Sequence, residues 1–239
     1  MTETFAALLL AHVLADFVFQ TRWIVLNKRR IAVLLLHGAV VLALMQAAFG
    51  RVDAWEFLAL ALLHVIVDGV KARLATPGLG AFLADQGAHL ATLAALAALR
   101  PDLWVGGAWA GLAWLPGLMA VVAGAVLATR AGGFAVGLLM APWAGDDLPK
   151  GLTNGGKLIG LLERGLVFLL VMVHQPAGIG FLIAAKSVLR FETTSKDQRA
   201  GEYVIIGTLA SFGWALLAAY ATQALMAALP PIGIPAAIP

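Results

Sequence analysis

Long apolar stretches alternate with short polar ones along most of the chain. A helix needs about 20 apolar residues to cross a bilayer, so this pattern predicts an all-α, polytopic membrane protein with about eight transmembrane helices. The predicted spans are 4–21, 31–49, 55–72, 81–99, 111–130, 156–174, 176–190 and 202–228. Strand-like alternation is not sustained in the sequence, which disfavours a barrel.

The pattern divides the chain into two predicted membrane regions. Residues 1–100 form a four-helix region, and residues 101–239 form a second region with basic cytoplasmic loops. In the second region, Arg130 and the pair Gly132–Gly133 interrupt the apolar pattern. The apolar run that follows is too short to cross a bilayer, so we expect a re-entrant or interfacial segment at 131–146.

Composition supports the membrane assignment. Apolar residues make up 62% of the chain and charged residues 12%, whereas a soluble domain has about 25% charged residues. We therefore expect membrane lipids as partners. Cysteine is absent, which excludes disulfides and thiolate metal ligands. The net charge of +3 is small and dispersed, which argues against a nucleic-acid partner.

Lysine and arginine predict the orientation of the spans. With the N-terminus outside, twelve of these residues fall in cytoplasmic loops or span ends, against only Arg51 and Arg100 outside. Eight spans then place both termini outside. The first apolar segment has no basic residues before it, so we expect it to be a mature span rather than a cleaved signal.

Histidines and aspartates repeat in the first four spans at one offset of 52 residues. The corresponding pairs are His12 and His64, Asp16 and Asp68, and His37 and His89. This predicts a tandem two-helix repeat, about 1–50 and 51–100, and two such units in one orientation can build a site between them. The copies differ, since Asp85 and Gln20 each occur in only one of them.

The spacing also predicts where these side chains lie. Residues four apart share a helix face, as in His64 with Asp68 and Asp85 with His89. An aspartate at mid-membrane costs about 2.5–3.5 kcal/mol, so several of them require a compensating partner. Imidazole and carboxylate are ligands of zinc, manganese and non-haem iron. We therefore expect a divalent metal, zinc first with manganese and iron as alternatives.

Seven residues are the predicted ligands, and this number suits two ions better than one, with Asp16 or Asp68 as a bridge. The metal ligands are His12, Asp16, His37, His64, Asp68, Asp85 and His89, and the catalytic candidates are Asp16, Asp68 and Asp85. Three other interpretations stay open: structural hydrogen bonds between helices, a proton or ion path, and bis-histidine haem ligation, which needs no aspartates.

A further set of polar residues could hold an anionic substrate. They are Gln20, Lys71, Gln86, Asn154, Glu163, Arg164, Lys186 and Arg190. Asn154 precedes two glycines that open a predicted helix, and a helix N-terminus can receive an anion. Lys186 and Arg190 form a basic i, i+4 pair suited to a lipid head group or a phosphate. We interpret His174 as a loop residue.

Several motifs carry a family resemblance. The stretches LLLAHVLADFVFQTRW, LLHVIVDGVKARL and DQGAHL resemble a bacterial integral membrane protein family of unknown function, DUF3307. FLIAAKSVLRFE and EYVIIGTLAS resemble the second half of many members. The resemblance implies a multi-pass protein of the bacterial inner membrane. The HxxxD pairs are also loosely similar to membrane-bound metal-dependent hydrolases.

These observations favour a membrane-embedded, metal-dependent hydrolase that acts on a lipid or lipid-phosphate from the cytoplasmic side. Water activated by the metal would be the nucleophile, and Lys71, Lys186 or Arg190 would hold the anionic group. The alternative is a transporter or channel, coupled to metal ions or protons, that uses the same cluster. A structural membrane scaffold is a third reading.

Overall fold

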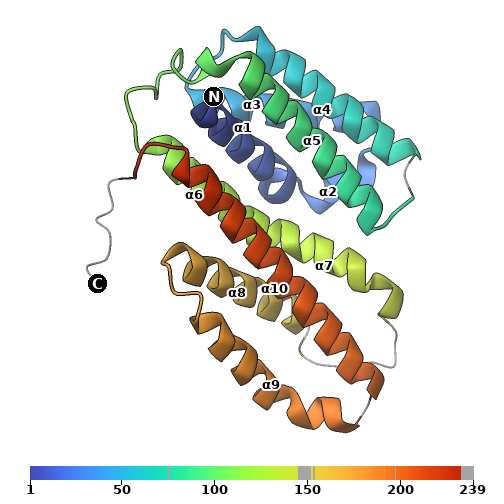
Figure 1. Cartoon of the computed structure of the whole chain (residues 1–239). Helices are drawn as coiled ribbons and strands as arrows, with labels where there is room; N and C mark the ends of the chain where they lie inside the picture. Colours follow the sequence, from blue (N-terminus) through green and yellow to red (C-terminus); the bar gives the residue numbers. More distant parts are fainter. Residues whose placement is uncertain (75, 145–151, 153, 197, 233–239) are drawn as a thin grey trace. The chain divides into compact units, whose positions relative to one another are not determined.

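A computed structural model describes residues 1–74, 76–144, 152, 154–196 and 198–232, with the backbone only for 189–196. Throughout these residues the regular elements are helices, and none of them forms a strand (Figure 1). The all-α prediction is therefore confirmed. Contacts divide the chain into two units, one of 1–123 with 224–239 and one of 124–223. The predicted division into 1–100 and 101–239 rests on spans and stays a prediction.

The first unit contains four long helices that pack side by side. They are α1 (Thr2–Leu14), α3 (Ile31–Phe49), α4 (Trp55–Leu74) and α5 (Leu79–Leu99). Both α1 and α4 contact α3 and α5, so the four surround a common interior. A π-helical turn, η1 (Ala15–Phe19), extends α1, and the short α2 (Arg22–Asn27) leads to α3. Thr21 begins α2 by accepting a hydrogen bond from the Ile24 amide.

The interior of this unit is apolar at one end. Phe49 and Phe57, at the junction of α3 and α4, are fully buried with ring centroids 4.8 Å apart. Trp104, just after the short 3-10 turn η2 (Pro101–Leu103), lies 6.2 Å from Phe49. The histidines and aspartates begin about three helical turns away, because His37 precedes Phe49 by twelve residues. The apolar packing therefore holds the helices together beyond the polar cluster.

The two ends of the first unit carry different charges. At the end formed by α2 and the C-terminus of α4, Arg29 donates to the Ala72 carbonyl and Arg73 to the Gly69 carbonyl. At the opposite end, Arg51 pairs with Asp53 and Arg100 with Asp102, and the Arg100 guanidinium lowers the pKa of Asp102 to about 2. The uncompensated basic residues thus gather at one end, although the orientation in a membrane stays a prediction.

The second unit is built from the helices of the C-terminal half. They are α6 (Leu115–Val126), the π-helical turn η3 (Leu127–Ala131), α7 (Gly132–Met140), the 3-10 turn η4 (Ala141–Trp143), α8 (Gly155–Met172), α9 (Gly178–Lys196) and α10 (Gln198–Ala227). Parts of α6 and α10 belong to the first unit. At the interruption expected near Arg130, η3 joins α6 to α7 without a break. The membrane placement of 131–146 stays a prediction, and 145–146 lie outside the described residues.

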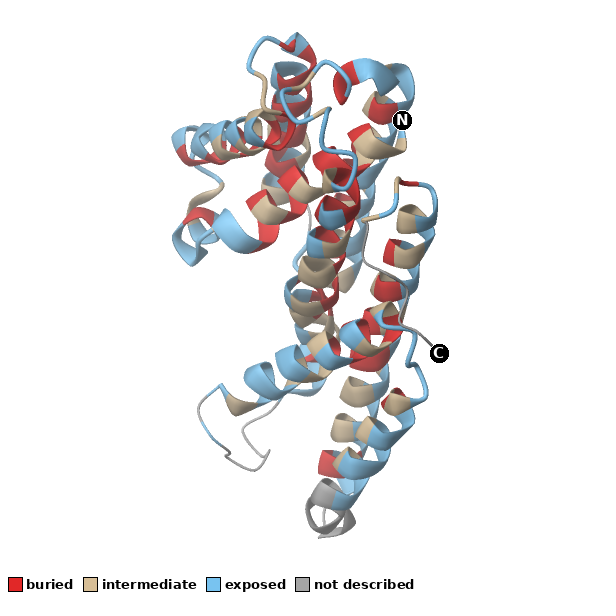
Figure 2. Ribbon diagram, turned by 90° about the vertical axis from the view of Figure 1, so that its left-hand side faces the viewer, coloured by how far each residue is buried: buried red, intermediate tan, exposed pale blue. Residues whose placement is uncertain are grey.

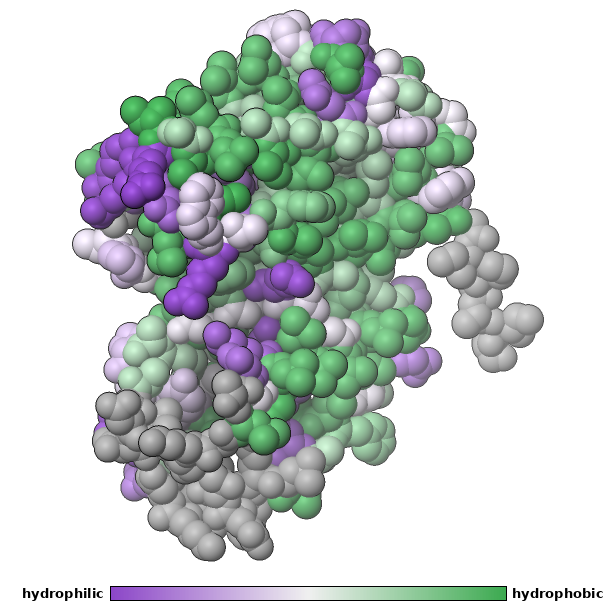
Figure 3. Space-filling model, turned by 180° about the vertical axis from the view of Figure 1, so that it is seen from behind, coloured by the Kyte–Doolittle hydropathy of each residue, from purple (hydrophilic) through white to green (hydrophobic). Residues whose placement is uncertain are grey.

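Among the described residues, five helices are long and apolar enough to cross a membrane. They are Thr2–Phe19, Ile31–Phe49, Leu79–Leu99, Leu115–Trp143 and Gln198–Ala227. The predicted count of eight and the tandem repeat are not confirmed. Helices α4 and α8, which we predicted as spans, are not among the five because each carries more than two charged residues. Buried and exposed residues lie on different sides of the same helices (Figure 2), and hydrophobic side chains cover much of the face shown in Figure 3.

Labelling of single cysteines tests the predicted orientation, since the chain has no cysteine of its own. Val52 and Thr76 are exposed and lie at opposite ends of α4. We expect a membrane-impermeant maleimide to label Val52→Cys in intact cells, and Thr76→Cys only after permeabilisation. Labelling of Thr76→Cys alone in intact cells would show the opposite orientation.

Candidate metal centre

The four long helices of the first unit bring all seven predicted ligands into one buried cluster. The residues are His12 and Asp16 from α1 and η1, His37 from α3, His64 and Asp68 from α4, and Asp85 and His89 from α5. Each is at most 8% exposed. The rings of His64 and His89 stack with centroids 4.0 Å apart, and His37 lies 5.2 Å from His64. The expectation that these side chains meet is confirmed, while their individual roles stay predictions.

The π-helical turn at Ala15–Phe19 positions Asp16. Its Oδ1 lies 3.1 Å from His37 Nε2 and 3.4 Å from His64 Nε2, so the carboxylate contacts α3 and α4 rather than its own helix. His12 instead shares a hydrogen bond of 3.2 Å with Gln86. A π turn shifts the register by one residue and is frequent at functional sites. The simple i, i+4 spacing therefore did not predict the partners of Asp16.

Several polar atoms converge on one ring nitrogen, His37 Nε2. Asp16 Oδ1 lies at 3.1 Å, the Gln20 amide nitrogen at 3.0 Å, His64 Nε2 at 3.2 Å and Asp68 Oδ2 at 3.4 Å. An imidazole nitrogen offers one N–H or one lone pair, which cannot satisfy four neighbours. A cation among these atoms would explain the convergence.

The triad of Asp16, His37 and His64 has the dimensions of a metal site. Its three ligand atoms are separated by 3.1, 3.2 and 3.4 Å. Around a tetrahedral zinc ion with bonds of about 2.0–2.1 Å, neighbouring ligand atoms lie about 3.3–3.4 Å apart. Three protein ligands would leave the fourth position open, as in catalytic zinc sites.

A second triad, formed by Asp68, Asp85 and His89, already contains positive charge. Lys28 Nζ lies 2.7 Å from Asp68 Oδ2, and Lys71 Nζ lies 2.6 Å from Asp85 Oδ2. Each ammonium group contacts one oxygen of its aspartate, and Asp85 Oδ1 has no hydrogen-bond partner among the described residues. Asp68 Oδ2 also lies 3.4 Å from both His37 and His64, so it connects the two triads.

The charges of the cluster favour a cation at the first triad. Asp68 and Asp85 each have a lysine, whereas Asp16 contacts two histidines and the Gln86 amide, which donates to its Oδ2 at 3.2 Å. Three carboxylates against two ammonium groups leave one negative charge. A metal ion or a protonated histidine would neutralise it, and a buried charge without such a partner is costly.

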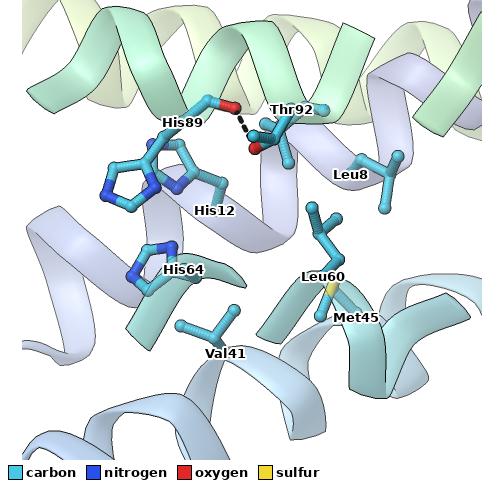
Figure 4. Close-up of a pocket in the computed structure, with 9 residues that line it drawn as sticks. Leu8, His12, Val41, Met45, Leu60, His64, His89 and Thr92 are labelled. Atoms are coloured by element: carbon cyan, nitrogen blue, oxygen red, sulfur yellow. Dashed lines mark hydrogen bonds between the residues drawn. The ribbon is translucent and has the colours of Figure 1, made fainter. Parts of the chain in front are cut away.

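A small cavity adjoins the histidines (Figure 4). The rings of His12, His64 and His89 gather at one side of it, and apolar side chains that include Leu8 and Met45 form the other. Its volume of about 10 Å³ is close to that needed by a single water. His89 Nε2 has no hydrogen-bond partner among the described residues. This space therefore suits a water molecule and excludes an organic substrate.

The other predicted substrate-binding residues have different surroundings. Gln20 and Lys71 contact the cluster, and Gln86 joins His12, Asp16 and Asp85. In the second unit, Lys186 pairs with Glu163 at 2.7 Å, and Arg164 donates to Thr129 and Ser211. Asn154 is exposed and precedes α8 with a φ of 61°. The side chain of Arg190 lies outside the described residues.

Sequence reasoning missed Lys28 as a member of the cluster. It lies in the basic run Lys28–Arg29–Arg30 between two spans, which predicts topology and does not distinguish one residue from the next. The structure also shows that Lys71 pairs with Asp85 rather than with Asp68, one turn away on its own helix. Both lysines extend from the cluster toward the surface, since Lys28 is 13% and Lys71 37% exposed.

In the part of the chain that the structure describes, the fold is all-helical, with five candidate membrane-spanning helices and a buried histidine–aspartate cluster. Residues 4–104 match the model of a family described as Protein of unknown function (DUF3307), which is the family that the N-terminal motifs resemble. The match contains all seven cluster residues. The resemblance of the second half stays a prediction. No curated protein and no solved structure matches the chain significantly.

Removal of Lys28 should destabilise the first unit. Lys28→Met would leave Asp68 buried without its ammonium partner, and loss of one partner of a buried pair costs about 3–5 kcal/mol. We expect a lower thermal unfolding midpoint in detergent, and recovery in the double variant Lys28→Met, Asp68→Asn. Arg22→Met, at an exposed position, is the control. An unchanged midpoint in Lys28→Met would contradict the pairing.

Proposed function

We propose that the first unit binds a divalent metal ion and uses it to hydrolyse a lipid or lipid-phosphate. The observation that carries the proposal is the convergence of Asp16, His37 and His64 at distances of 3.1–3.4 Å. Zinc fits this set of nitrogen and oxygen ligands best, with manganese and iron as alternatives. Lys28 and Lys71 already neutralise Asp68 and Asp85, so one ion is the simpler occupancy.

A divalent ion at such a site can lower the pKa of a coordinated water to about 7, which makes it a nucleophile at neutral pH. His89 is suited to accept the proton of that water, because its Nε2 is buried without a hydrogen bond beside the water-sized cavity. The water oxygen would bond to the phosphorus or carbonyl carbon of the substrate as the ester bond breaks. The proton would then pass to the leaving alcohol.

The substrate would approach from the side of Lys28 and Lys71. These residues lie at the polar edge of the cluster, and the partly exposed Lys71 could exchange Asp85 for an anionic oxygen of the substrate. Lysine ammonium groups bind phosphate as point charges. The surrounding helices expose apolar side chains, for example Ile66 and Val70 on α4, and these favour a lipid over a soluble ester.

Transport coupled to metal ions or protons is a second candidate, and one observation favours it. Ionisable groups link His89, which lines the cavity, to Lys71: His89 Nε2 lies 3.6 Å from Asp85 Oδ1, and Asp85 Oδ2 lies 2.6 Å from Lys71 Nζ. This chain runs from the buried cavity to a side chain that is 37% exposed. Such chains of ionisable groups can relay protons within a membrane. A structural scaffold would be expected to bind no metal.

Elemental analysis tests the metal centre. We expect the full chain, purified without chelators, to hold about one divalent ion, and His37→Ala or His64→Ala to hold less than about a tenth as much. His174→Ala is the matched control, because His174 is an exposed histidine in the turn after α8. A metal-free native protein would refute both the metal centre and the hydrolase.

A hydrolysis assay separates the enzyme from the transporter. Full-length protein in vesicles that contain a lipid phosphate should release product, and a chelator or Asp16→Asn should lower the rate by at least about 100-fold. His174→Ala should retain the rate. If the protein binds metal but releases no product, and instead carries metal ions or protons across the vesicle membrane, the transporter is the correct function.

A further inference from the structure

A second polar group lies in the second unit around Arg164 of α8. Its guanidinium is buried, with 5% of the residue exposed. Nε donates to the Thr129 carbonyl and Nη1 to the Ser211 hydroxyl, each at 3.1 Å. A guanidinium has five N–H donors, and these bonds use two of them. No carboxylate among the described residues forms an ion pair with Arg164.

The acidic neighbour of Arg164 is engaged elsewhere. Glu163 pairs with Lys186 of α9 at 2.7 Å. Adjacent residues on a helix do not face each other, and Glu163 and Arg164 have different hydrogen-bonding partners. The Lys186 ammonium also lies 5.6 Å from the centre of the Phe212 ring. Lys186, which we expected to bind an anion, is therefore already paired with a carboxylate, whereas three donors of the neighbouring Arg164 are not used by its bonds to Thr129 and Ser211.

Glycines provide the space that Arg164 occupies. A Cβ atom at Gly133 would lie 3.1 Å from Nη2, and one at Gly160 would lie 2.9 Å from Nη1. At Gly132, a Cβ would lie 2.9 Å from Cδ of the same side chain. The Thr129 carbonyl that accepts from Nε belongs to the π-helical turn η3. The local backbone of α7, α8 and η3 thus holds the guanidinium in place.

Arg164 lines a cavity of about 1030 Å³ within the second unit. This volume is at the upper end of the usual range of ligand sites, about 300–1,000 Å³, and far exceeds that of a phosphate ion. Among the described residues, four basic residues and one acidic residue line it: Arg130, Lys157, Arg164, Lys186 and Glu163. Apolar side chains that include Phe134, Met140 and Ile159 form the remaining wall. The cavity therefore combines positive charge with hydrophobic surface.

We propose that this cavity binds an anionic lipid, with the oxyanion of the head group on Arg164 and an acyl chain along the apolar wall. Arginine binds phosphate or carboxylate with two parallel hydrogen bonds, and three of its donors are not used by the bonds to Thr129 and Ser211. A free anion would leave the apolar wall uncovered. This site does not depend on the metal centre and involves only residues of the second unit.

Lipid binding by the purified full chain tests the proposal. Native mass spectrometry would compare phosphatidic acid with phosphatidylcholine of the same acyl chains, with inorganic phosphate as a competitor. We expect phosphatidic acid to bind preferentially. Arg164→Gln should weaken its binding by about 10- to 100-fold, because a hydrogen-bonded charge is lost. Arg22→Gln, which removes an exposed arginine in the first unit, should bind as the native protein does.

A pair of glycine variants tests the cavity without altering Arg164. A Cβ at Gly137 or at Gly213 would meet no atom within 4 Å, so both positions accept a larger side chain. Gly137 lines the cavity, whereas Gly213 is an exposed residue of α10 outside the lining. We expect Gly137→Leu to weaken lipid binding and Gly213→Leu to leave it unchanged.

Three outcomes would overturn the proposal. The first is equal binding of the two lipids. The second is unchanged binding in both Arg164→Gln and Gly137→Leu. The third is displacement of phosphatidic acid by an equal concentration of inorganic phosphate, which would show a site for the free anion. Loss of binding in Gly137→Leu supports the proposal even if Arg164→Gln does not fold.

Discussion

The burial of three carboxylates among apolar helices is the constraint on which the first unit depends. Asp16, Asp68 and Asp85 are each at most 8% exposed, and removing such groups from water is costly unless opposite charge accompanies them. Lys28 and Lys71 reach two of them, so the connection before α3 and the end of α4 are tied to the interior. Asp16 is held by histidines from two further helices. The cluster therefore joins all four helices. It specifies the rotation of each helix about its own axis, which apolar contacts alone would not do.

Much of this arrangement could be predicted from the sequence. The length of the apolar stretches predicted the long helices. The i, i+4 spacing predicted that His64 and Asp68 share one helix face and that Asp85 and His89 share another. The partners across the helices could not be predicted, because they depend on the rotation of each helix and on the π turn at Asp16. Lys28 was missed because a lysine in a basic loop is also expected from topology alone. The pairing of Glu163 with Lys186 likewise required the packing of α8 against α9.

Both π-helical turns of the described chain lie at polar sites. The turn Ala15–Phe19 carries Asp16, and the turn Leu127–Ala131 provides carbonyls to Arg164 and Trp214. In a π turn the backbone hydrogen bonds are rearranged by one extra residue, so a carbonyl or side chain can face a neighbouring helix. In an apolar environment such backbone groups need partners, and Arg164 and the Trp214 indole supply them for η3. Each unit thus combines an irregular turn with buried charge.

The amide of Gln86 has a consequence for the protons of the cluster. Its nitrogen donates to Asp16 and Asp85, at 3.2 and 3.1 Å, so its oxygen must face His12 Nε2. His12 must then carry a hydrogen on Nε2, and in the neutral ring Nδ1 is left as a bare lone pair. One uncharged side chain therefore selects the tautomer of a histidine on another helix. An ionised acid at position 86 would have nearly the same shape and would still accept from His12 Nε2, yet it would turn the two attractions to Asp16 and Asp85 into repulsions.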